Sequence, residues 1–173
     1  MLDRLSYRSL QWLVAAFALL HNLEEALTIP AYAPTVRQRL SGLAPTALLA
    51  ATQDLSWLYV TLAAATFVPA VVVLVATSGR ASRGKAWAVA FVQGLFLANV
   101  FVPHVPAALV LGGYAPGLAT AVLINLPYSV YFLRRSVREQ AVSRAGVALA
   151  VGLAVPALFL ALGTLYLIVG MLV

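Results

Sequence analysis

The chain has 173 residues, of which 63% are hydrophobic and only 9% are charged, and its mean hydropathy is +0.97. This composition is too apolar for a water-soluble globular domain and predicts an integral membrane protein. The net charge of +6 could suit nucleic acid, but the basic residues form short clusters between apolar runs, so we expect no nucleic-acid partner. The absence of cysteine excludes disulfides, thiolate ligands and a cysteine nucleophile.

Apolar segments of membrane-spanning length cover nearly the whole chain, which predicts a single integral membrane domain over residues 1–173. The first segment is similar to a signal peptide, but His21, Glu24 and Glu25 extend it to about the twenty residues that a bilayer requires, so we expect it to remain. We therefore predict an all-α, polytopic membrane helical bundle. Its five transmembrane helices are expected at about residues 10–29, 46–76, 86–111, 115–133 and 145–173.

Two connections are expected at the outer ends of these spans. The longer one, from Pro30 to Pro45, carries Val36, Leu40 and Leu43 at helical spacing, which predicts a short interfacial helix. The shorter one, residues 112–117, has the glycines and the proline that are typical of a tight turn between two helices.

The basic residues are distributed unevenly between the two ends of the predicted spans. Of the 11 in the chain, only Arg37 and Arg39 fall at the outer end. The positive-inside rule then predicts a cytoplasmic N-terminus. We expect a multi-pass protein of the cell (plasma) membrane, with membrane lipids as partners, and the sequence also allows a homo-oligomer.

Several ionisable and amide side chains fall inside the predicted spans, where they are costly unless paired, hydrated or bound to a metal. At a rise of about 1.5 Å per residue, five of them from four spans lie roughly 6 to 15 Å from the outer end of their span. These are His21, Glu25, Asp54, His104 and Asn125. Agreement in depth predicts a common pocket in the outer half of the bilayer. A solvated position at the end of its span is the alternative for Asp54.

Neighbours in the sequence indicate how the two histidines are presented. His21 lies three and four residues before Glu24 and Glu25, so all three side chains share one helix face. His104 stands between Pro103 and Pro106, which predicts a kinked helix with His104 inside the bundle.

Three motifs of the chain together resemble those of the HXXEE-domain membrane proteins. They are His21-Asn22-Leu23-Glu24-Glu25, the lone later His104, and Tyr114-Ala115-Pro116-Gly117. The resemblance implies a bundle of about five spans and a role for His21, Glu24, Glu25 and His104, and it names no reaction.

Two imidazoles with carboxylates are a ligand set for catalytic zinc, our first expectation, or for iron or manganese. We expect His21, His104, Glu25 and Glu24 as metal ligands, with the glutamate that is not bound acting as general base. Asp54, Asn99 and Asn125 would complete the site or orient the histidines. This favours a membrane metalloenzyme that hydrolyses an amide or ester of a lipophilic molecule.

Three alternatives stay open. A metal-free pair of His and Glu could isomerise or cyclise a sterol- or terpenoid-like substrate, helped by aromatic residues such as Trp57, Tyr59 and Phe101. A small transporter or proton-coupled carrier is the second. In the third, the groups merely pair and hold the helices together.

Overall fold

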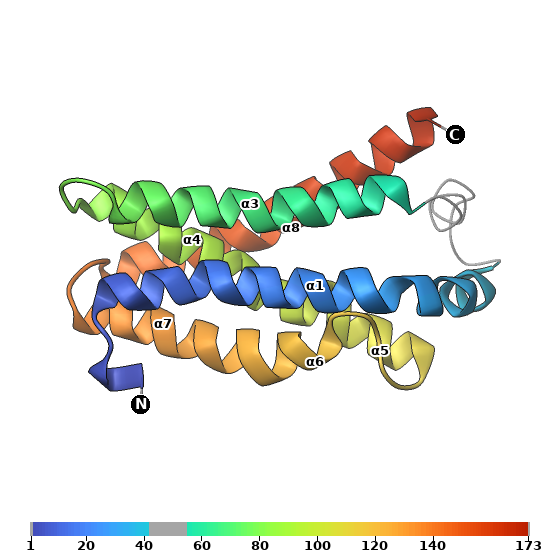
Figure 1. Cartoon of the computed structure of the whole chain (residues 1–173), viewed down its shortest axis with the longest axis horizontal. Helices are drawn as coiled ribbons and strands as arrows, with labels where there is room; N and C mark the ends of the chain where they lie inside the picture. Colours follow the sequence, from blue (N-terminus) through green and yellow to red (C-terminus); the bar gives the residue numbers. More distant parts are fainter. Residues whose placement is uncertain (1, 42–54, 173) are drawn as a thin grey trace.

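The computed structural model describes residues 2–41 and 55–172, and every regular element within these ranges is helical (Figure 1). This confirms the predicted all-α class for the described part of the chain. After a short helix η1 (Leu2–Arg4), the elements are α1 (Tyr7–Leu40), α3 (Ser56–Thr77), α4 (Arg83–Asn99), η2 (Val100–His104), α5 (Val105–Leu111), α6 (Leu118–Thr120), η3 (Ala121–Asn125), α7 (Leu126–Arg138) and α8 (Arg144–Leu172). α4, η2 and α5 follow one another without a break, as do α6, η3 and α7.

Four helices of the described part are long and apolar enough to cross a membrane, which indicates a membrane protein. They cover Tyr7–Arg39, Ser56–Thr77, Arg83–Leu111 and Arg144–Ala161. The helix from Leu118 to Arg138 is not among them. Its last turns carry Arg134, Arg135 and Arg138, which lower its apolar character, and its role as a fifth span stays a prediction.

The expected outer loop does not begin at residue 30, because α1 continues to Leu40. Val36 and Leu40 are helical as predicted, but they belong to α1 and not to a separate interfacial helix. Pro30 and Pro34 lie inside this helix. Each proline removes one backbone hydrogen bond, but its fixed φ is compatible with a helix. Contact between the rings of Tyr32 and Tyr114, whose centroids are 5.3 Å apart, packs the extension against the bundle.

Other boundaries differ by up to ten residues. The second helix begins at Ser56 instead of 46, and residues 42–54, with Leu43, Pro45 and Asp54, lie outside the described residues. The third begins earlier, at Arg83, because the Ser82 side chain caps it by accepting the N–H of Lys85. The fourth is shifted to 118–138, since residues 112–117 form the predicted turn.

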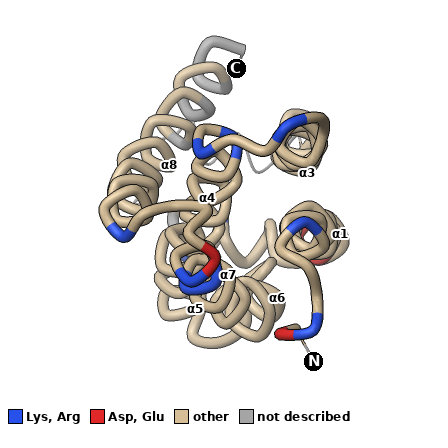
Figure 2. The backbone as a smooth tube through the Cα atoms, turned by 90° about the vertical axis from the view of Figure 1, so that its left-hand side faces the viewer, with Lys and Arg blue, Asp and Glu red and all other residues tan. Residues whose placement is uncertain are grey.

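Helix α4 lies at the centre of the bundle and packs against α8, α7 and α3, while α1 packs along α3 (Figures 1 and 2). The core is apolar: Leu10, Val14, Val73, Val89 and Phe132 are all at most 1% exposed. These side chains form a close-packed layer between one end of the bundle and its middle.

Most of the basic residues lie at one end of the molecule, where α1, α4 and α8 begin and α3 and α7 end (Figure 2). Asp3 lies there too and accepts a hydrogen bond from Arg138 at 2.8 Å. Hydrogen bonds from Arg138 and Tyr131 hold the pKa of the Asp3 carboxyl below its ordinary value. Arg37 and Arg39 lie in the last turn of α1, at the other end.

Candidate metal centre

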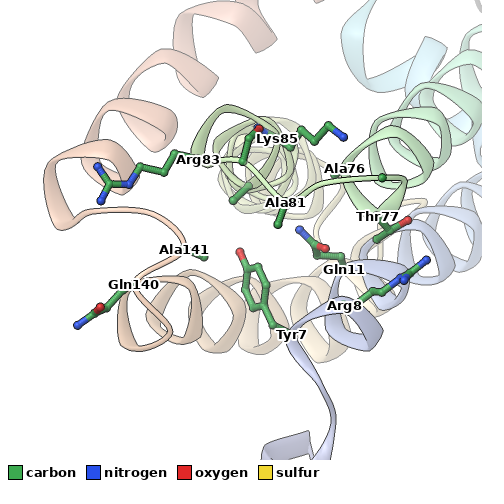
Figure 3. A pocket seen from close by; sticks show the side chains of 13 residues that line it. Tyr7, Arg8, Gln11, Ala76, Thr77, Ala81, Arg83, Lys85, Gln140 and Ala141 are labelled. Atoms are coloured by element: carbon green, nitrogen blue, oxygen red, sulfur yellow. The ribbon is translucent and has the colours of Figure 1, made fainter.

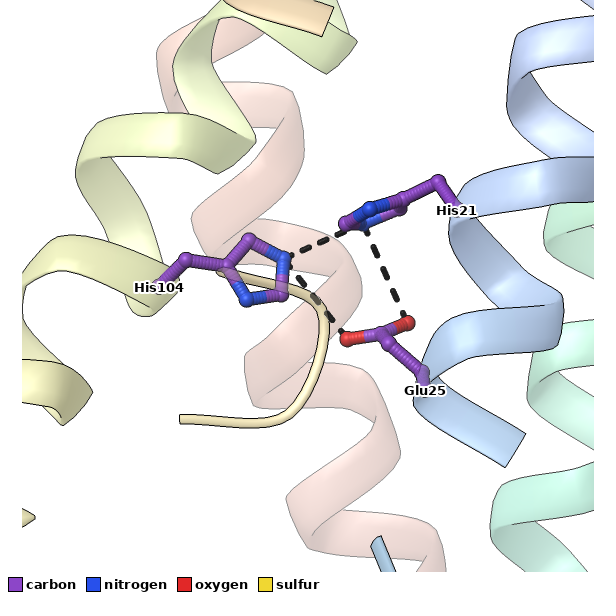
Figure 4. A group of neighbouring side chains, drawn as sticks. All are labelled: His21, Glu25 and His104. Carbon is purple, nitrogen blue, oxygen red and sulfur yellow. Dashed lines mark hydrogen bonds and ion pairs between the residues drawn. The ribbon is translucent and has the colours of Figure 1, made fainter. Parts of the chain in front are cut away.

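Two histidines and one glutamate converge inside the bundle (Figure 4). His21 and Glu25 occupy successive turns of α1, and His104 comes from η2. The two Nε2 atoms are 3.1 Å apart, Glu25 Oε1 is 3.6 Å from His104 Nε2, and Glu25 Oε2 is 4.0 Å from His21 Nε2. Three of the five residues that the sequence places at one depth therefore lie together.

A kink brings His104 into this position. Residues 100–104 form a π-helical segment, and Val102, just before Pro103, has a non-helical backbone with φ −147° and ψ 109°. Proline at this point cannot donate the bond that would continue the α-helix. His104 is only 2% exposed, so the prediction that it faces the interior is correct. His21, on α1, is 1% exposed.

The Nδ1 atom of each histidine has a hydrogen-bond partner in or just after the turn over residues 112–117. His104 Nδ1 lies 2.9 Å from the carbonyl oxygen of Pro116, which can only accept, so Nδ1 carries the proton. His21 Nδ1 lies 2.8 Å from the hydroxyl of Thr120, and that hydroxyl can donate to the Gly117 carbonyl. Both neutral imidazoles therefore present an Nε2 lone pair to the centre.

Two lone pairs and a carboxylate that face one another repel unless a cation or a proton lies between them. The side-chain nitrogen of Asn99 supplies part of this compensation, at 3.1 Å from His21 Nε2 and 2.9 Å from His104 Nε2. Exchange of the Asn99 amide oxygen and nitrogen would instead place an oxygen ligand beside both imidazoles. The structure thus brings Asn99 into the centre.

The spacing of the donor atoms approaches that of the ligands of a small divalent cation. Tetrahedral zinc with bonds of about 2.0–2.1 Å holds its ligand atoms about 3.3 Å apart. The two Nε2 atoms are 3.1 Å apart, and each lies 3.6 or 4.0 Å from a different oxygen of Glu25. With one ligand atom from each residue, the three atoms lie within 4.8 Å of one another, so the side chains must move closer to bind such a cation. Hydrogen bonds from Nδ1 to a carbonyl or hydroxyl oxygen are the usual way of orienting such ligands.

Glu24 lies outside this group, because its carboxylate binds the start of the next helix. One oxygen accepts the N–H of Ala119 at 3.1 Å and the other that of Thr120 at 2.7 Å. The Tyr114 hydroxyl donates to the first oxygen as well. Glu24 therefore caps the helix that begins at Leu118 and fastens the 112–117 turn to α1.

Gly117 closes one side of the centre. Its φ is +79°, and a Cβ built on it would lie 2.6 Å from Cε1 of His104, 2.8 Å from Cγ of Glu25 and 3.0 Å from Cε1 of His21. Only a glycine permits this backbone to approach the three side chains so closely.

The remaining predicted residues are not connected to the centre by the structure. Asn125 is 2% exposed on η3, its side-chain nitrogen has no hydrogen-bond partner within the described chain, and no bond joins it to the histidines. Asp54 falls outside the described residues.

Sequence reasoning missed Thr120 and the backbone at Pro116 and Gly117. The motif Tyr114-Ala115-Pro116-Gly117 predicts a turn, which it forms, but its carbonyl groups also orient the site. A backbone carbonyl group cannot be recognised from the sequence. The one signal in the sequence was that the family resemblance contains this motif together with the HXXEE motif.

A family model described as "protein of unknown function with HXXEE motif" matches residues 12–132 of the chain. This range contains every described residue of the centre. Searches of curated proteins and of solved structures returned no match.

Proposed function

The chain belongs to the HXXEE family, and from this premise we propose that it is a metal-dependent membrane enzyme that hydrolyses a lipophilic substrate. The observation that carries the proposal is the set formed by His21 Nε2, His104 Nε2 and a Glu25 oxygen, which lie within 4.8 Å of one another. Two imidazoles and one carboxylate leave a coordination position open for water or substrate, as catalytic zinc sites do. Iron and manganese accept the same ligands.

A bound cation would activate water and polarise the carbonyl group of an ester or amide. The chain's own residues would hold the ligands in place. Pro116 and Thr120 hydrogen-bond the two imidazoles, and Glu24 hydrogen-bonds the segment that contains Pro116 and Thr120. Both Glu24 oxygens accept hydrogen bonds, so we assign Glu24 a positioning role in place of the base or ligand role expected from the sequence.

We further propose five spans with the N-terminus in the cytoplasm of a cell whose plasma membrane holds the protein. The basic end of the bundle would then face the cytoplasm, and the centre would lie in the outer half of the bilayer. The Glu25 side chain is 17% exposed, while the two histidines are at most 3% exposed, so a lipophilic substrate would reach the centre past Glu25.

Metal-free acid–base catalysis is the second candidate, and the contacts of Asn99 favour it. One amide group satisfies both Nε2 lone pairs without a metal. Tyr59 and Phe101, expected to assist such chemistry, are 42% and 54% exposed and so contribute little to an enclosed site. Transport is less well supported, because the close-packed apolar side chains of Val14, Val73 and Val89 lie between the centre and the basic end.

Purified protein in liposomes, supplied with fluorogenic long-chain acyl esters and amides, provides the test. We expect hydrolysis that stops on chelation, returns with zinc, iron(II) or manganese, and is lost in His104→Gln. Phe101→Leu is the matched control, because it changes an exposed residue of the same segment. Hydrolysis that survives both chelation and His104→Gln would overturn the proposal. Double-bond isomerisation by metal-free protein would favour the second candidate.

A further inference from the structure

A cavity of about 430 Å³ opens at the basic end of the bundle, far from the histidines (Figure 3). It lies between the start of α1, the end of α3, the start of α4 and the turn before α8. Gln11, which lines it, precedes His21 by ten residues on α1, a distance of about 15 Å along the helix axis. The cavity is therefore a separate site, and its ligand can be inferred independently of the metal centre.

Every charged residue that lines this cavity is basic: Arg8, Arg83 and Lys85. The Lys85 ammonium donates to the carbonyl oxygens of Ser78 and Arg80, at 2.7 and 3.3 Å, which holds it beside the opening. Arg8 and Arg83 are exposed and form no ion pair with the residues that the structure describes.

The acids at this end of the bundle are already engaged. Asp3 pairs with Arg138 at 2.8 Å, and Glu139 pairs with Arg135 at 2.6 Å. The cavity consequently keeps an uncompensated positive potential, which attracts anions.

Neutral hydrogen-bonding groups form the inner wall. The Gln11 side chain is only 6% exposed and has no hydrogen-bond partner in the described part of the chain. Its amide points into the cavity, as does the Tyr7 hydroxyl (Figure 3). The amide is therefore accessible only from the cavity, where it can donate a hydrogen bond to a ligand.

The cavity also contains the N-terminal end of α4, a helix of 17 residues. The Ser82 side chain already accepts the N–H of Lys85, but the backbone N–H of Arg83, which also lines the cavity, has no partner within the helix. Such a group at a helix start favours a phosphate.

We propose that this cavity binds a phosphate group, either of a phospholipid headgroup or of a soluble phosphate ester. Arg8 and Arg83 neutralise its charge, the start of α4 contacts its oxygens, and the Gln11 amide donates a hydrogen bond from the inner wall. The volume exceeds that of a bare phosphate and suits a larger headgroup or ester. The basic end of the bundle is also where the sequence predicts the headgroups of the cytoplasmic leaflet.

Native mass spectrometry of the whole protein can test this binding against two probes, phosphatidylglycerol and glycerol 3-phosphate, with phosphatidylcholine as the neutral lipid. The double variant Arg8→Gln/Arg83→Gln removes two lining cations. Arg134→Gln/Arg144→Gln is its matched control, because it removes two exposed arginines from the same end that do not line the cavity.

We expect the affinity for at least one probe to fall about tenfold or more in the lining variant and in Gln11→Leu, as for loss of hydrogen bonds to a charged group. It should stay unchanged in the control variant. Binding of the lipid alone identifies a headgroup site, and binding of the ester identifies a soluble ligand. Equal losses in the two arginine variants would show general attraction to basic residues and overturn the proposal, as would no binding of either probe. If Gln11→Leu fails to fold, the comparison of Arg8→Gln/Arg83→Gln with Arg134→Gln/Arg144→Gln still tests the proposal.

Discussion

The two glutamates of the HXXEE motif, Glu24 and Glu25, are neighbours in the sequence but make different contacts. Glu25 lies one helical turn after His21 and faces the centre, at 3.6 Å from His104. Glu24 is rotated by about 100° around the helix axis and meets the N–H groups of Ala119 and Thr120 instead. We infer that Glu25 is a ligand and that Glu24 holds the segment that orients the ligands.

The two glutamates should therefore separate metal binding from stability. Glu25→Gln is expected to weaken zinc binding more than about 100-fold, beyond the loss typical of groups that only orient ligands. Glu24→Gln should lower the free energy of unfolding by about 1 kcal/mol, because an uncharged cap interacts less well with a helix start, and should largely keep zinc. Calorimetric zinc titration and thermal unfolding measure the two effects. Equal zinc affinities in the two variants would refute the division of roles.

Thr120 is expected to tune the centre without binding the metal. Thr120→Val removes the oxygen that lies 2.8 Å from His21 Nδ1 and should weaken zinc binding about tenfold. Thr61→Val is the control, since the Thr61 hydroxyl donates only to the Trp57 carbonyl of its own helix. Unchanged affinity in Thr120→Val would show that His21 needs no partner at Nδ1.

At the scale of elements, the turn over residues 112–117 is a lid of backbone on the centre. It joins α5 to α6 and lies against His21, Glu25 and His104 through Gly117. The turn can lie this close to the three side chains because Gly117 has no side chain and because the Tyr114 hydroxyl donates a hydrogen bond to Glu24. The turn and the first helix thus form one unit.

Gly117→Ala should disrupt this unit. The added methyl group would meet His104 at 2.6 Å, and the positive φ adds about 1–2 kcal/mol of strain, so we expect lower stability and loss of zinc binding. Gly113→Ala is the control in the same turn, because nothing lies within 4 Å of its Cβ. Retained zinc binding in Gly117→Ala would mean that the turn lies farther from the centre.

At the scale of the whole molecule, the basic end should face the cytoplasm. The chain has no cysteine, so single cysteines can report its orientation directly. An impermeant maleimide should label the Ser41→Cys variant in intact cells. It should label the Ser78→Cys variant only after the cells are permeabilised. The two serines are matched, since each is exposed and bonds a carbonyl oxygen of the preceding turn. The reverse pattern would contradict the predicted topology.

The sequence predicts the helices and the meeting of His21, Glu25 and His104, because apolar length and depth along a helix are one-dimensional properties. It fails where three-dimensional packing decides. The loop expected from Pro30 onward is in fact a continuation of the first helix as far as Leu40, since tertiary contacts support this extension. Depth alone could not distinguish Glu24 from Glu25, nor reveal the carbonyl groups that orient the histidines.

X-ray absorption spectroscopy of the purified protein after loading with zinc tests the central claim most directly. We predict about one bound zinc with nitrogen and oxygen neighbours at about 2.0–2.1 Å and the scattering pattern of two imidazoles. Glu25→Gln should lose this signal. Less than about a tenth of an equivalent of zinc after dialysis, or a shell without imidazole, would contradict a metal centre built by His21, Glu25 and His104.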